Sequence, residues 1–74
     1  MMSSGTKQIQ IVVNGQMREV PRQDSLAGLL AHLEIDPARV AVELNRAIVR
    51  REDWDSTPVG AGATLEIVQF VGGG

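Results

Sequence analysis

The sequence predicts a small α+β domain in which one helix covers one face of a mixed β-sheet. Three observations predict this fold class. Segments in which apolar residues alternate with other residues lie on both sides of a single segment with helical periodicity. An Asn-Gly pair joins the first two alternating segments. The chain has 74 residues, which suffices for one domain and is too short for two.

The first two strands are expected to form a β-hairpin. Three apolar residues carry the alternation of the first strand: Ile9, Ile11 and Val13. Asn14-Gly15 follows directly, and this pair favours a two-residue turn because both residues tolerate a positive φ. Residues 16–20 are expected to be the return strand. Pro21 should end it, because proline has no N–H to donate to a neighbouring strand.

One amphipathic helix is expected after the hairpin. Asp24 and Ser25 are candidate N-cap residues. Four leucines at positions i, i+3, i+4 and i+7 form one apolar stripe: Leu26, Leu29, Leu30 and Leu33. Asp36-Pro37 should stop the helix, since the residue before a proline avoids the helical region. The helix would then have about three turns.

The remainder of the chain predicts three more strands. Alternation marks a third strand at Val40, Val42 and Leu44, and a fourth at Ile48-Val49 after a turn at Asn45-Arg46. Residues 50–63 contain one proline and two glycines, and we interpret them as a loop. Residues 65–70 are expected to form the last strand.

This order of elements has few compact solutions. The right-handed crossover rule lets the first and last strands lie side by side and parallel in the middle of the sheet. That is the β-grasp arrangement of ubiquitin-like proteins, with one helix on one face. We expect a disordered leader at residues 1–7, a single domain at 8–70 and a flexible C-terminal tail at 71–74.

The composition argues against several functions. The formal net charge is −2, which does not favour a nucleic-acid partner. The chain has no cysteine and one histidine, so a Cys/His zinc site cannot be assembled within it. His32 is expected on an exposed helix flank and Lys7 near the chain end, which are poor places for catalysis. We therefore expect no enzyme and no bound metal or cofactor. Without a long apolar run or a signal peptide, we expect a cytoplasmic protein with no membrane partner.

The most informative feature is the glycine end. Gly72, Gly73 and Gly74 follow an apolar strand directly. Because glycine has no Cβ, such a tail can pass through a narrow channel and present its carboxylate to the active site of another protein. A carboxylate is a poor electrophile at neutral pH, and adenylation from ATP would activate it.

Nearly the whole chain, from Ile9 to Gly74, resembles the sulfur carrier proteins of thiamin biosynthesis, the ThiS family. The resemblance is carried by IVVNGQMREV, by SLAGLLAHLEIDPARVAVELN with IVRREDW, and by LEIVQFVGGG. The chain departs from the usual family pattern in two turns, at Asn45-Arg46 and at Gly62-Ala63.

The resemblance implies a function for the tail. Gly74 would be adenylated and converted to a thiocarboxylate, while Gly72 and Gly73 thread the partner's channel. The implied partners are a ThiF-type adenylyltransferase that uses ATP, a sulfur-donating enzyme, and thiazole synthase as the acceptor.

Beside the tail, Val68, Phe70 and Val71 are a candidate partner-docking patch, because alternation places Val68 and Phe70 on the open face of the sheet. A bulge that turns Phe70 toward the core is an equal alternative. Trp54 is expected to close one end of the core rather than to bind a ligand. The arginines are interpreted as solvated surface residues: Arg18, Arg22, Arg50 and Arg51.

Two alternatives to the thiamin pathway stay open. One keeps the tail chemistry and changes the pathway, as in the small subunit of molybdopterin synthase or another sulfur carrier. The other is a plain interaction module with an incidental glycine tail, which would still bind its partner after Gly73 and Gly74 were removed.

Overall fold

The computed structural model describes residues 7–70. The elements follow one another in this order: β1 (Gln8–Val13), β2 (Gln16–Pro21), α1 (Leu26–His32), the 3₁₀ helix η1 (Pro37–Arg39), β3 (Val40–Leu44), β4 (Ala47–Val49), the 3₁₀ helix η2 (Arg51–Ser56) and β5 (Thr64–Gln69). The expected leader and tail lie outside the described residues, except for Lys7. The Lys7 carbonyl accepts a hydrogen bond from the Arg22 N–H at 2.7 Å.

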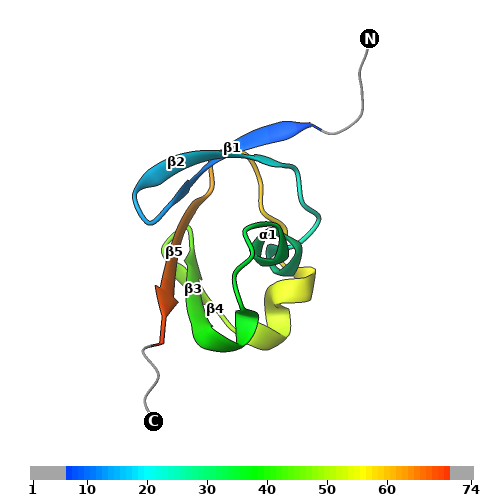
Figure 1. Cartoon of the computed structure of the whole chain (residues 1–74). Helices are drawn as coiled ribbons and strands as arrows, with labels where there is room; N and C mark the ends of the chain where they lie inside the picture. The colour runs from blue at the N-terminus through cyan, green and yellow to red at the C-terminus, as the bar shows by residue number, and fades with distance from the viewer. Residues whose placement is uncertain (1–6, 71–74) are drawn as a thin grey trace.

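All five strands form one mixed sheet in the order β2-β1-β5-β3-β4 (Figure 1). The first and last strands, β1 and β5, are parallel neighbours, as the sequence predicts. The other neighbouring pairs are antiparallel. The helix α1 lies on one side of the sheet (Figure 1), so the fold is the expected β-grasp arrangement.

Both hairpins close through tight turns in which two residues have positive φ. In the first turn, Asn14 has a φ of 51° and Gly15 a φ of 82°, as the Asn-Gly pair predicts. In the second turn, Asn45 and Arg46 have φ values of 52° and 73°. Arginine at a positive φ is strained because its Cβ crowds the backbone, so the second turn forms without the glycine that suits it best.

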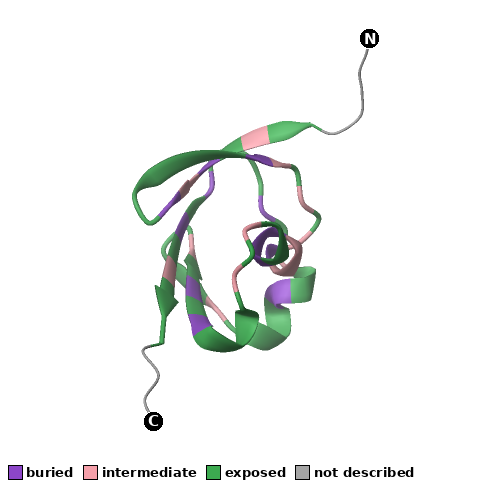
Figure 2. Ribbon diagram, in the orientation of Figure 1, coloured by how far each residue is buried: buried purple, intermediate pink, exposed green. Residues whose placement is uncertain are grey.

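The helix begins where the sequence predicts. Ser25 is the N-cap, and its side-chain oxygen accepts a hydrogen bond from the Gly28 N–H at 3.1 Å. The core lies between α1 and the sheet, as the buried positions in Figure 2 show. Six large side chains are almost completely buried: Ile11, Leu26, Leu29, Leu30, Val42 and Leu65. Burying each one stabilises the fold by about 2 kcal/mol before entropy is counted.

The helix is shorter than the three turns that we expected. It ends at His32, and Leu33 is its C-cap and only partly buried. The chain then enters the left-handed region at Glu34, whose φ is 61°. Two hydrogen bonds close the end, from Glu34 N–H to Ala31 O and from Ile35 N–H to Leu30 O, both at 3.0 Å. This Schellman motif ends the helix before the proline is reached.

Asp36-Pro37 has a different role from the helix stop that we expected. Pro37 is the first residue of η1, and the Asp36 carboxylate accepts a hydrogen bond from the Ala38 N–H at 3.0 Å. Proline suits this position because the first N–H of a helix has no helical partner.

The interpretation of residues 50–63 as a loop is wrong in part, because η2 lies within them. Trp54 explains the difference. Its indole is only 4% exposed, and its Nε1–H donates to the Val49 carbonyl at 2.9 Å. The Arg51 guanidinium lies over the ring, 5.8 Å from its centroid. Trp54 therefore closes one end of the core, as predicted, and its burial draws the segment into helical turns.

Replacing Glu34 by glycine should stabilise the protein. Glycine adopts the left-handed conformation at this helix end without steric cost, so E34G should raise the free energy of unfolding by about 1 kcal/mol. Urea denaturation would measure the change. As a matched control, A31G places glycine inside the exposed face of α1 and should lower stability by about 1 kcal/mol. Equal destabilisation by both variants would contradict the assigned helix end.

Replacing Trp54 by phenylalanine should destabilise the protein by about 1–2 kcal/mol, because the Val49 carbonyl loses its donor and the core loses volume. Circular dichroism during urea denaturation would measure the loss, since the variant has no tryptophan fluorescence. R51A removes the cation over the ring together with a long hydrogen bond from Arg51 to the Ala38 carbonyl (3.5 Å), and it should cost about 0.5 kcal/mol. Unchanged stability of W54F would show that the indole does not hold this end of the core.

Candidate functional site

The carboxyl end of β5 is the part of the structure that leads to the glycine tail. β5 lies between β1 and β3 and runs away from the β1–β2 hairpin (Figure 1). The described residues end at Phe70, one residue after the strand. The predicted site residues of the tail lie outside the described residues: Val71, Gly72, Gly73 and Gly74. The structure therefore describes the segment that precedes these residues and not the residues themselves.

On one side, the end of β5 is held by β3. The antiparallel register runs from Leu44↔Leu65 to Val40↔Gln69, so the pairing reaches the last residue of β5. Beyond the strand, the Phe70 N–H donates to the Arg39 carbonyl at 2.8 Å. The backbone is thus fixed against its antiparallel neighbour as far as the residue before the tail.

On the other side, a side chain takes over where the β1 strand ends. The parallel register between β1 and β5 covers only Val12↔Thr64 and Val13↔Leu65. The Asn14 N–H then donates to the Leu65 carbonyl at 2.9 Å. The Asn14 Oδ1 accepts from the Ile67 N–H at 2.7 Å, and its Nδ2 donates to the Ile67 carbonyl at 3.1 Å. The amide of Asn14 thus takes the place of one further strand residue.

The second hairpin supplies a related contact at the opposite end of β5. The Asn45 Oδ1 accepts from the Thr64 N–H at 3.0 Å, and the Asn45 N–H donates to the Thr64 carbonyl at 2.7 Å. Sequence reasoning assigned both asparagines to turns and missed these bonds. The Asn-Gly pattern reports the turn conformation, and no local signal reveals a side-chain partner 53 residues away.

The open face of the sheet carries exposed apolar side chains near the end of β5. Val68 is 59% exposed and Phe70 is 53% exposed. This decides the alternative for Phe70, which lies outside the core. With Ile48 from β4, which is 76% exposed, Val68 borders a shallow hollow of about 110 Å³. We call Ile48, Val68 and Phe70 the apolar patch.

Acidic side chains accompany the apolar patch. Glu43 of β3 and Glu66 of β5 are direct neighbours in the register, and both line the same hollow. Both are exposed, and neither forms an ion pair with another residue in the described range 7–70. The patch is therefore an apolar surface beside negative charge, which is typical of a protein–protein contact with a basic partner.

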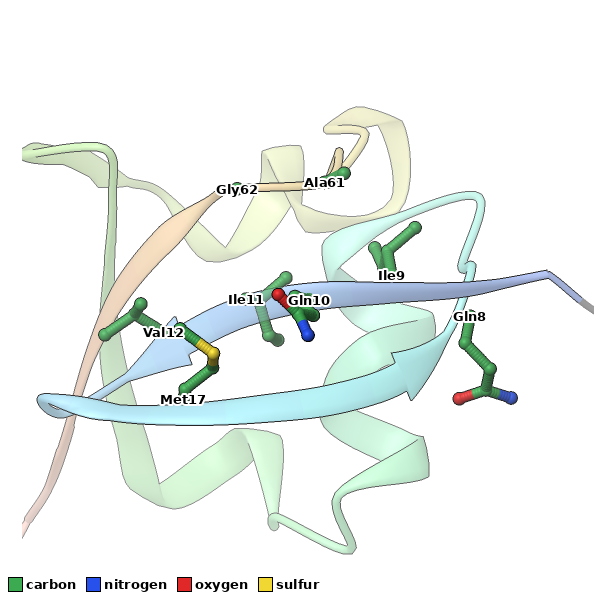
Figure 3. A pocket seen from close by; sticks show the side chains of 8 residues that line it. All are labelled: Gln8, Ile9, Gln10, Ile11, Val12, Met17, Ala61 and Gly62. Atoms are coloured by element: carbon green, nitrogen blue, oxygen red, sulfur yellow. The ribbon is translucent and has the colours of Figure 1, made fainter.

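A second groove lies along β1, away from the end of β5. It has a volume of about 350 Å³ and is bordered by β1, Met17 of β2 and the Ala61-Gly62 segment. Figure 3 shows Met17 and Val12 side by side at one end of this groove. These two residues face each other in the hairpin register. The groove contains no cluster of charged or nucleophilic groups, since its lining residues are glutamine, aliphatic, methionine and glycine residues.

The other polar side chains have surface roles. His32 is exposed on the helix, as expected, and Arg18 and Arg22 are exposed. Arg50 lies 3.6 Å from Glu52. Within residues 7–70, no three His, Cys, Asp or Glu side chains are grouped so that they could hold a metal ion. No helix in this part of the chain is long and apolar enough to cross a membrane.

The chain is similar to known proteins over most of its length. Residues 11–74 match the ThiS family. The crystal structure of the thiamine biosynthesis protein ThiS of Geobacter metallireducens is 33% identical, with a TM-score of 0.76 over 89% of this chain and 100% of that one. Its solution structure is 35% identical, with a TM-score of 0.73 over 89% of this chain and 88% of that one.

The curated relatives include proteins of very different length. A thiazole synthase of Paramagnetospirillum magneticum is 38% identical over 66 residues, which are 89% of this chain and 20% of that protein. The chain thus spans about a fifth of the length of this relative. The uncharacterized protein ycf40 of Pyropia yezoensis is 36% identical over 66 residues, which are 89% of this chain and 93% of that one.

The family match covers the sheet, the helix and the glycine tail, and the fold agrees with that of the ThiS structure from Geobacter metallireducens. The chain therefore belongs to the ThiS family of small, ubiquitin-like sulfur carrier proteins, which are carriers and not enzymes.

Proposed function

We propose that this chain is the sulfur carrier of thiamin biosynthesis and that its sulfur is carried on Gly74. The observation that carries the proposal is the extent of the family match, which runs to residue 74 and so includes the glycine tail. The proposal takes Gly74 as the carboxyl-terminal residue, whose free carboxylate is the reacting group. The names of the two Geobacter metallireducens structures support the thiamin pathway.

The chemistry takes two steps on the carboxylate. A carboxylate oxygen attacks the α-phosphorus of ATP and pyrophosphate leaves, which gives an acyl-adenylate. A hydrosulfide equivalent from a sulfur-donating enzyme then attacks the carbonyl carbon, and AMP leaves with the bonding electron pair. The product is a thiocarboxylate. A ThiF-type adenylyltransferase would bind the ATP, so the carrier itself needs no cofactor.

The acceptor that we propose is thiazole synthase. Thiazole synthases of Paramagnetospirillum magneticum and Magnetococcus marinus contain a segment similar to this chain, which makes up 20% of each protein. Joining a carrier-like segment to a synthase in one chain raises the effective concentration of one for the other. This arrangement supports a direct contact between the two proteins where they are separate chains.

The apolar patch is the surface that we propose for docking. Val68 and Phe70 lie at the end of β5, so a partner bound there is next to the tail. Apolar side chains that are half exposed in the free protein stabilise a complex when a partner covers them and removes them from water. Because glycine has no Cβ, residues 72–74 can enter a channel that is too narrow for larger residues.

Intact-mass measurement tests the proposed chemistry. After incubation with ATP, a ThiF-type adenylyltransferase and a sulfide source, the protein should gain the mass difference between sulfur and oxygen. A variant without Gly74 should stay unchanged, because its carboxylate is about 3.5 Å short of the reacting position. An enzyme preparation that modifies its own carrier serves as the positive control.

Failure to modify this chain under those conditions would contradict the carrier function and favour the interaction module. If the thiocarboxylate forms, adding thiazole synthase or the large subunit of molybdopterin synthase separates the pathways. Sulfur loss to thiazole synthase alone is the expected result.

Replacing Phe70 by serine should weaken docking. Loss of an exposed aromatic side chain from an interface should raise the KM of the adenylyltransferase for this carrier about tenfold. The matched control is Met17→Ser. Met17 is also exposed, at 69%, but it lies on β2, two strands away from β5 and level with the beginning of that strand rather than its end. M17S should leave the KM unchanged. Equal effects of the two variants would contradict docking at the apolar patch.

A further inference from the structure

We propose that Asn14 is a positioning residue, which fixes the direction in which β5 leaves the sheet toward the tail. The inference rests on the proposed function, since this direction matters only if the carboxyl end enters a partner's active site. Asn14 touches no reacting group. It acts through the main chain of Ile67, three residues before the end of the described chain.

A strand that is bonded on one side only can rotate about that side. Between Ile67 and Phe70, the antiparallel neighbour β3 holds one side of β5. On the other side the parallel register ends at Val13↔Leu65, because the chain turns at Asn14. The Asn14 amide then holds both polar groups of the Ile67 backbone, at 2.7 and 3.1 Å. The second side of β5 is thus fixed for two residues beyond the strand pairing.

The turn alone does not require this side chain. Its φ of 51° at Asn14 is equally accessible to glycine. The pair of hydrogen bonds to the Ile67 backbone does require an amide, because one group must accept a hydrogen bond and an adjacent group must donate one. Aspartate at position 14 would keep the acceptor for the Ile67 N–H and lose the donor. Glycine would lose both.

A more mobile exit from the sheet lowers the fraction of encounters in which the tail is aligned with the channel. Small misplacements of a reacting group reduce rates strongly, because alignment must then be achieved during each encounter. Asn14→Gly should therefore lower kcat/KM for adenylation about tenfold. It should also speed amide hydrogen exchange at Ile67 about tenfold, the effect of losing one ordinary hydrogen bond.

The chain offers a matched control in Asn45→Gly. Asn45 occupies the same place in its turn, with a φ of 52°, and its side chain also accepts a hydrogen bond from β5. That bond is to Thr64, at the beginning of the strand. N45G should therefore lose about as much stability in urea as N14G does. Its amide exchange at Ile67 and its kcat/KM should stay within about twofold of the values for the protein without substitutions. Asn14→Asp should restore most of the protection at Ile67.

Three variants and two measurements test the proposal, with stability in urea as the control. Amide exchange followed by NMR needs no partner, and adenylation is followed by pyrophosphate release with the ThiF-type enzyme. Equal kcat/KM for N14G and N45G would overturn the positioning role, as would unchanged exchange at Ile67 in N14G. If the protein without substitutions is not adenylated, the proposed function fails and the positioning role of Asn14 fails with it. Faster Ile67 exchange in N14G would then show only that Asn14 holds the strand.

Discussion

The structure depends on the insertion of β5 between β1 and β3. β5 is the last element of the chain, yet it lies in the middle of the sheet, so neither hairpin can join the other until it arrives. Leu65, at the point where β5 meets both neighbours, is fully buried and belongs to the same core cluster as the three buried leucines of α1. The same strand that completes the core thus leads directly to the glycine tail.

This arrangement separates two demands on one strand. Near its beginning, β5 is paired on both sides and buries Leu65 in the core, which holds the fold together. Toward its end the strand carries the exposed Val68, and the exposed Phe70 follows directly after it, at the residue before the tail. The beginning of the strand, which is paired on both sides, holds the exposed end in position. A carrier needs this combination, because the reacting end must move between partners while the docking surface beside it stays constant.

The sequence predicted the parts of the fold that local chemistry determines. Alternation marked the strands, the leucine spacing marked the helix, and Asn14-Gly15 marked the first turn. The end of α1 was misplaced because the chain reverses at Glu34, a residue with no intrinsic preference for a positive φ. The helix η2 was missed because it depends on burial of Trp54 against the core, a tertiary effect that no local pattern records.

The candidate site divides in the same way. Alternation along β5 placed Val68 on the open face, and the structure decided the position of Phe70. Ile48 and Glu43 join that surface from strands that are distant in the sequence, so only the register of β3 with β4 and β5 reveals them. The bonds between Asn14 and Ile67 were beyond prediction for the same reason.

The central claim is that the chemistry takes place on the carboxylate of Gly74 and nowhere else. Tandem mass spectrometry of the sulfur-loaded protein tests it most directly. No lysine or arginine follows Arg51, so trypsin releases residues 52–74 as one peptide, which also contains the side-chain carboxylates of Glu52, Asp53, Asp55 and Glu66. The account predicts that sulfur is found only in fragments that include Gly74. Sulfur in a fragment without Gly74 would contradict it.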